Sequence, residues 1–251
     1  MENSKIQCTV FDTIDSFNRA ATNFWVRSAR QAINARGIFH TVLTGGGTPG
    51  PIYQLLASSE YATQLQWENI HIYEGDERYV PHSHPDSNFG MAKRLMLDAV
   101  HIPEENLHPI PTHYTDAHEA ASCYENEIRT SLKTGANQLP KFDLIMLGMG
   151  ADGHTASLFP DTTALDENEK AVTALYVEKL KSWRVTMTYP VFNYARQVMV
   201  VVTGKEKARI IEHIFMKDAA EIYPIQKIKP VGEFFWFMDS AAGELLNQSD
   251  P

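Results

Sequence analysis

The chain has 251 residues, 43% of them hydrophobic and 21% charged, which is typical of a globular protein with a sizeable core. Its net charge of −9 argues against nonspecific nucleic-acid binding, which needs clustered Lys and Arg, but not against a small anion held by a few cations. We see no apolar run long enough to cross a bilayer and no signal peptide, so we expect a cytoplasmic protein without a membrane or nucleic-acid partner. The two cysteines, Cys8 and Cys123, are expected as reduced thiols.

Short apolar runs alternate with helical patterns along the chain. Strands are predicted at residues 8–11, 39–43, 70–73, 142–147, 185–188, 198–202 and 234–238, and helices at residues 15–36, from about residue 51, and at residues 205–216. In the first helix Asp15 is the predicted N-cap and Gly37 the end. The run FDLIML lacks polar alternation after its Asp, as expected for a parallel strand covered on both faces. We therefore predict one α/β domain over residues 1–251, built around a mainly parallel sheet with helices on both faces.

A glycine-rich segment, TGGGTP, follows the predicted strand at 39–43 and contains Thr44, Gly45, Gly46, Gly47 and Thr48. Ligands of open α/β sheets bind at the carboxyl ends of the strands, which is where this segment lies. Its amide and hydroxyl groups, with the following helix N-terminus, favour an anion, most naturally phosphate. The segment matches neither GxxxxGK[ST] nor GxGxxG. The alternative is a tight strand-to-helix turn that binds nothing.

A second polar loop follows the strand at 70–73. Arg78 could clamp a phosphate, because its planar guanidinium matches phosphate oxygens; the alternative is a plain surface ion pair with the neighbouring acids. His82, His84 and Asp86 suggest a metal site, but a His-x-His loop needs further ligands, so we predict no metal.

The third loop, GMGADGHTASLFP, follows the strand at 142–147. His154 directly follows a glycine there, and an imidazole at such a place suits proton transfer, with Asp152 available to orient it. The alternative is an ordinary surface or core histidine. Arg184 opens a predicted strand and Lys207 lies at a helix start, where a cation opposes the helix dipole unless an anion compensates it; the alternative is solvated surface charge.

Together these segments resemble the 6-phosphogluconolactonase family. The matching segments are LTGGGTP (43–49), GDERYVP (75–81), SNFGM (87–91), LGMGADGHTASLFP (147–160), RVTMT (184–188), NYA (193–195), VTGKEKA (202–208) and FFWFMD (234–239). The resemblance implies the three-layer α/β fold shared with glucosamine-6-phosphate deaminase and ribose-5-phosphate isomerase. It also implies hydrolysis of 6-phospho-D-glucono-1,5-lactone to 6-phosphogluconate in the oxidative pentose phosphate pathway, without metal or organic cofactor.

The resemblance also implies roles for individual residues. His154 is the expected general base and Asp152 its partner, and the substrate and its phosphate are expected on the glycine loop with Asp76, Arg78, Asn88, Arg184 and Lys207. Many family members approach the strand of Arg184 with a Lys-Pro-Pro-like segment, whereas this chain has VEKLKSW.

Two alternatives to the lactonase were considered. The related deaminase has a Glu where this chain has Phe159 and a Tyr where it has Arg78, so the sequence favours the lactonase. A non-catalytic sugar-phosphate binding protein on the same fold would be expected to have lost the Asp-Gly-His triplet, which is intact here. We expect a monomer, with a homodimer as the alternative.

Overall fold

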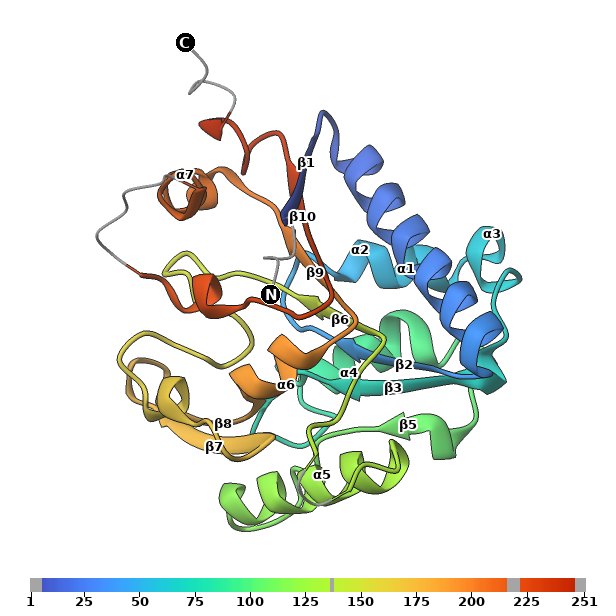
Figure 1. Cartoon of the computed structure of the whole chain (residues 1–251), viewed down its shortest axis with the longest axis vertical. Coiled ribbons are helices and arrows are strands. Elements are labelled where there is room, and N and C mark those ends of the chain that lie inside the picture. The colour runs from blue at the N-terminus through green and yellow to red at the C-terminus, as the bar shows by residue number, and fades with distance from the viewer. Residues whose placement is uncertain (1–5, 136–137, 216–221, 247–251) are drawn as a thin grey trace.

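A parallel sheet of seven strands forms the centre of the molecule (Figure 1). The computed structural model describes residues 6–135, 138–215 and 222–246, and the strands run in the order β1-β10-β9-β6-β2-β3-β5. Their bounds are β1 Ile6–Phe11, β2 Phe39–Leu43, β3 Ile70–Glu74, β5 Leu107–His108, β6 Leu144–Leu147, β9 Gln197–Val202 and β10 Glu233–Asp239. All neighbouring pairs are parallel, which confirms the predicted sheet.

Helices cover both faces of this sheet and complete a three-layer arrangement. One face packs against α1 Ile14–Arg36, α2 Gly50–Ala57, α3 Ser59–Ala62 and α4 Asn88–Ala92, and the other against α5 Ala117–Ser131, α6 Tyr189–Tyr194 and α7 Ala208–Phe215. Successive residues of β6 alternate between the two cores: Leu144 and Met146 face α1 and α2, while Ile145 and Leu147 face the α5 side. Because apolar residues pack against both faces of this strand, FDLIML needs no polar alternation.

The N-cap of the first helix lies two residues before the predicted one. Thr13, not Asp15, is the N-cap: its Oγ1 accepts from the Ser16 amide at 3.1 Å, and the Ser16 hydroxyl accepts from the Thr13 amide at 3.2 Å. This reciprocal pair satisfies two amides that the helix leaves unpaired, so the prediction for Asp15 was wrong. Gly37 ends the helix as predicted, in the left-handed conformation with φ 77°.

A smaller antiparallel sheet lies beside the main one. It has the order β4-β8-β7, with bounds β4 Asp76–Arg78, β7 Val172–Val177 and β8 Ser182–Met187. The strand predicted at 185–188 therefore exists, but it belongs to this sheet and not to the parallel one. Neither β7 nor α5 was predicted. Three of the five buried residues of α5 are alanines, beside Tyr124 and Ile128, which gives a weak apolar pattern.

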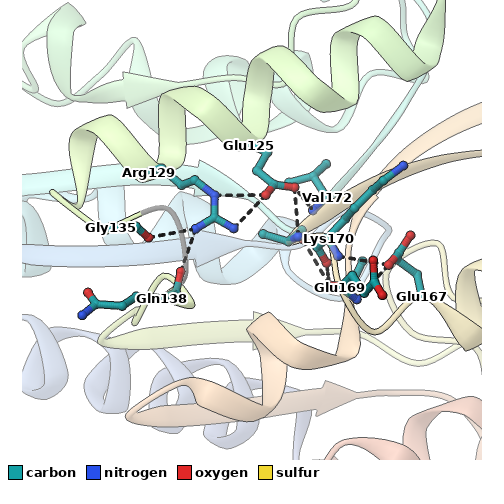
Figure 2. Close-up of polar contacts among 10 residues, drawn as sticks. Glu125, Arg129, Gly135, Gln138, Glu167, Glu169, Lys170 and Val172 are labelled. Carbon is teal, nitrogen blue, oxygen red and sulfur yellow. Dashed lines mark hydrogen bonds and ion pairs between the residues drawn. The ribbon is translucent and has the colours of Figure 1, made fainter.

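A partly buried ion pair on α5 holds this smaller sheet in place (Figure 2). Glu125 Oε1 accepts from Arg129 Nε at 3.0 Å and from Nη2 at 2.8 Å, while Oε2 accepts from the amides of Ala171 and Val172 at 2.9 and 3.2 Å. Arg129 also donates to the Gln138 carbonyl at 2.6 Å. The start of β7 is thereby fixed to α5, and with it the hairpin that contributes to the site described below.

The helix predicted at 205–216 is a 3-10 turn, Lys205–Lys207, followed by α7, and residue 216 lies outside the described residues. Residues 161–170 form a largely exposed loop that buries Ala164. Both cysteines are free thiols. Among the described helices we find none long and apolar enough to cross a membrane.

Candidate active site

The carboxyl ends of the parallel strands open into a cavity of about 490 Å³. All three predicted loops reach it, although they lie far apart in the sequence. It is lined by Thr44, Gly45, Gly46, Gly47, Thr48, Asp76, Arg78, Asn88, His154, Arg184 and Lys207, among others. Asp152, the remaining predicted residue, is not among its lining residues but contacts His154 directly. The structure therefore brings the predicted residues together in one place.

The three glycines of the first loop have different reasons for being glycine. A Cβ on Gly45 would lie 1.9 Å from Asn88 Oδ1, so Gly45 makes room for a neighbouring side chain. Gly46 has φ 92°, a conformation that residues with a Cβ rarely adopt. Gly46 and Gly47 both border open space, since a Cβ on either would meet no atom within 4 Å. The loop is anchored at Thr44, whose amide and carbonyl both hydrogen-bond to the Tyr53 hydroxyl, at 3.1 and 2.7 Å.

His154 is held by the chain immediately before it. Its Nδ1 forms a short hydrogen bond to Asp152 Oδ1, and its amide donates to the same oxygen at 3.2 Å. Because Nδ1 donates to a carboxylate, Nε2 carries the lone pair. A Cβ on Gly150 would lie 2.0 Å from the imidazole, so this glycine provides the space that His154 occupies. The sequence analysis did not single out Gly150.

The Asp152 carboxyl is strongly biased toward its charged form. Burial opposes ionisation, yet hydrogen bonds from Lys179 and then from His154 hold the pKa of Asp152 well below its usual range. Lys179 also lines the cavity and was not predicted. It lies 27 residues beyond Asp152 in the sequence, on the connection between β7 and β8, and no local pattern links the two.

Two arginines are paired on neighbouring strands of the smaller sheet. Arg78 of β4 is the register partner of Arg184 of β8, and both line the cavity. Arg184 is only 9% exposed, and its Nε and Nη1 have no hydrogen-bond partner. Burial lowers the pKa of Arg184, the Asp76 charge opposes that shift, and the Arg78 charge adds to it. Like charges opposite one another in a sheet are destabilising, so this pair suits a ligand with more than one negative charge.

The acids of the second loop organise it by hydrogen bonding. Glu77 is fully buried and accepts from four donors: the amides of Arg78, Asn88 and Phe89 and the Ser87 hydroxyl, at 2.7 to 3.0 Å. Asp76 accepts from the Ser157 hydroxyl at 2.6 Å, and its carbonyl accepts from Asn88 Nδ2 at 2.9 Å. Asp76 thus ties the second loop to the third and places a carboxylate beside Arg184.

The histidines of the second loop do not converge on a metal position. His84 Nδ1 lies 3.7 Å from Asp86 Oδ2, whereas His82 Nε2 faces the Ile110 carbonyl at 2.8 Å. Among the described residues, His82 instead lies near Glu74 and Glu77, with one ligand atom of each within 4.8 Å of the others. Burial first, and then the Glu77 charge, raise the pKa of Glu74 well above its usual range. Glu77 already accepts four hydrogen bonds, and Glu74 Oε2 accepts one from the Ile110 amide at 2.7 Å.

Comparison with known proteins agrees with this geometry. A family model described as glucosamine-6-phosphate isomerases/6-phosphogluconolactonase matches residues 12–236. The chain belongs to this family. It is 45% identical to a 6-phosphogluconolactonase of Synechocystis sp. over 217 residues, which are 86% of this chain and 88% of that protein. The structure of a 6-phosphogluconolactonase from Trypanosoma cruzi matches with a TM-score of 0.88 at 27% identity, over 97% of this chain and 98% of that one.

The family's description names two kinds of enzyme, and Phe159 bears on the choice between them. A monomeric glucosamine-6-phosphate deaminase matches with a TM-score of 0.80 over 95% of this chain and 99% of its own, but at 16% identity, so the likeness is one of fold alone. Phe159 is 5% exposed, and its ring centroid lies 4.1 Å from that of His154. An apolar ring therefore packs beside the imidazole, at the sequence position where the resemblance implies a Glu in the deaminase.

Proposed function

We propose that this protein hydrolyses 6-phospho-D-glucono-1,5-lactone to 6-phospho-D-gluconate, the second step of the oxidative pentose phosphate pathway. The names of its relatives support the reaction. The single observation that carries the substrate's position is the buried, unpartnered guanidinium of Arg184 opposite Arg78, in the same cavity as His154.

The cations at one side of the cavity would bind the 6-phosphate. A buried charge without a partner is costly, and a phosphate dianion would pair with Arg184 while screening its repulsion from Arg78. Lys207, whose side chain is 16% exposed, and the amides of the loop at Gly46 and Gly47 line the same cavity and would take the remaining oxygens. Fixing the phosphate would hold the lactone ring with C1 toward His154, which contributes rate through orientation.

His154 would supply the proton transfers. Nε2 takes a proton from a water molecule as that water attacks the C1 carbonyl, giving a tetrahedral oxyanion and an imidazolium. When the bond between C1 and the ring oxygen breaks, the imidazolium returns the proton to that oxygen, which becomes the C5 hydroxyl. Asp152 holds the ring through Nδ1 and stabilises the imidazolium. The lactone is an activated ester, so no cofactor or metal is needed for this route.

The proposal covers one domain over residues 1–251, acting in the cytoplasm as a monomer, with a homodimer as the alternative. Its ligand is a sugar-phosphate lactone.

The test follows the loss of freshly generated 6-phosphogluconolactone after subtraction of its spontaneous hydrolysis. The wild-type protein should accelerate this loss strongly. In parallel, glucosamine 6-phosphate should yield no detectable ammonia or fructose 6-phosphate. Ammonia release at a rate rivalling lactone hydrolysis would assign the chain to the deaminases. Binding of 6-phosphogluconate without acceleration of either reaction would favour a non-catalytic sugar-phosphate binding protein.

A further inference from the structure

Lys179 belongs to a group of four contacting side chains that includes the proposed base. The group consists of Asp152, His154, Phe159 and Lys179. Lys179 lies in the 3-10 turn Glu178–Leu180 that connects β7 to β8 and lines the cavity. Its Nζ binds Asp152 Oδ2, while His154 Nδ1 binds Oδ1 of the same carboxylate. The Lys179 ammonium also lies 4.7 Å from the centroid of the Phe159 ring, the same ring that packs on His154. The ammonium and the imidazole therefore share both of their neighbours.

We propose that Lys179 is a positioning residue that keeps His154 available as a base by neutralising the far oxygen of Asp152. This inference rests on the proposed lactonase function. An unopposed carboxylate on Nδ1 would favour the imidazolium and so withhold the base at neutral pH. With Lys179 on Oδ2 the carboxylate still orients the ring, but part of its charge is offset before any proton is taken.

The alternative is that the contact between Lys179 and Asp152 is an ordinary surface ion pair without a role in the site. The Lys179 side chain is 53% exposed and that of Asp152 34% exposed, so the pair should contribute little to the stability of the fold. That same exposure is useful here, because removing the ammonium should leave the fold intact and change only the electrostatics of the site. Lys181, two residues later, has φ 47°, which fixes the turn that presents Lys179.

The other groups near this pair are already engaged or lie elsewhere in the cavity. The charged residues that line it besides Lys179 are Asp76, Arg78, Arg184 and Lys207. Asp76 accepts from Ser157 at 2.6 Å, and Lys207 contacts Glu206 at 3.0 Å. On the other side, Tyr223 packs against Gly153, and its hydroxyl lies 3.3 Å from His213 Nδ1. Among the described residues, the side chains that contact the Asp152 carboxylate are those of Lys179 and His154.

The test is the pH dependence of kcat/KM for the lactone in Lys179→Met, Lys179→Arg and a control, Lys141→Met. Lys141 is a fitting control because its ammonium also lies over an aromatic ring, 4.8 Å from the Tyr194 centroid, but lines a different pocket. In Lys179→Met the acidic limb should move to higher pH by about one unit, which is a tenfold loss on that limb. KM and the melting temperature should change little. Lys179→Arg and the control should leave the limb in place.

Two outcomes would overturn the inference: an unchanged profile in Lys179→Met, or a loss of equal size at every pH, which would indicate a purely structural role or direct contact with the substrate. Failure of the lactonase proposal is separable from both. The imidazole proton resonances of His154, assigned by their loss in His154→Asn, can be titrated by NMR without substrate. The titration midpoint should rise in Lys179→Met relative to wild type, and an identical midpoint would refute the proposed role whatever the reaction is.

Discussion

Replacement of Arg184 by Met should separate phosphate binding from folding. In the ligand-free protein Arg184 is the register partner of Arg78, and its buried guanidinium leaves Nε and Nη1 without partners. Burial lowers the pKa of Arg184 despite the nearby Asp76 charge. The folded state thus disfavours this charge. Met has a similar length without the charge, and Asp76 keeps its hydrogen bond from Ser157. We therefore expect the ligand-free variant to be at least as stable as the wild type.

The binding of phosphorylated ligands should suffer instead. Each hydrogen bond from a charged donor contributes about 1.5–3 kcal/mol, so losing two of them costs about 3 kcal/mol or more. Since 1.4 kcal/mol is tenfold, affinity for 6-phosphogluconate and kcat/KM for the lactone should fall by at least about 100-fold. Unphosphorylated glucono-lactone should be affected far less, because it never uses these donors.

Thermal unfolding with and without 6-phosphogluconate measures both effects. A ligand at about 100 times its Kd stabilises the wild type by about 2.7 kcal/mol, or roughly 5–10 °C for a chain of this size. At the same concentration Arg184→Met should show almost no shift. Arg196→Met is the control, because Arg196 pairs with Asp143 in a different pocket. A ligand-free variant that unfolds at a much lower temperature, yet is stabilised by ligand as the wild type is, would show that Arg184 serves the fold.

Three further results are expected. His154→Asn should lower kcat about 100-fold or more without changing the melting temperature, and near-normal turnover would remove His154 from the mechanism. Activity should survive exhaustive chelation, because a histidine base and an activated ester need no Lewis acid; a loss reversed by zinc would contradict this. Burial, together with neighbouring histidines, lowers the pKa of His40 to about 3 and of His71 to about 4, from 6.5. The unfolded chain therefore binds more protons below about pH 6.5, and urea unfolding should show stability falling from there toward pH 4. His71→Gln should make the free energy of unfolding depend less steeply on pH in this range. An unchanged slope would argue against a lowered pKa of His71 as the cause.

The parts of the fold that could be predicted are those whose causes are local in sequence. Strand β6 is a short, wholly apolar run because both of its faces are covered, and that pattern is visible without any knowledge of its neighbours. The cavity residues were predictable for a related reason. Polar and glycine-rich loops directly follow these strands, and parallel strands bring their carboxyl ends to one edge.

The parts that were missed depend on contacts between distant segments. Helix α5 buries a face rich in alanine. Its Glu125 accepts hydrogen bonds from the start of β7, 46 and 47 residues later in the sequence. The strand at 185–188 was predicted, but its membership of a second sheet follows from pairing with β4 and β7. Lys179 looks like one more exposed lysine until the β7–β8 hairpin brings it to Asp152.

The placement of charge explains how an acidic protein can bind an anionic substrate. The whole chain carries −9, yet the cavity is lined by Arg78, Lys179, Arg184 and Lys207 against the single acid Asp76. Asp152 adds one more negative charge behind His154, and Lys179 is the cation that contacts it. What remains facing the cavity is a positive region at the end where we propose that the phosphate binds, and field lines are focused there by the surrounding protein. The two ends of the site thus require different local charge: a surplus of positive charge at Arg184, and a net charge near zero at His154. The smaller sheet and its connecting turn supply both, since β8 carries Arg184 and the turn before it carries Lys179.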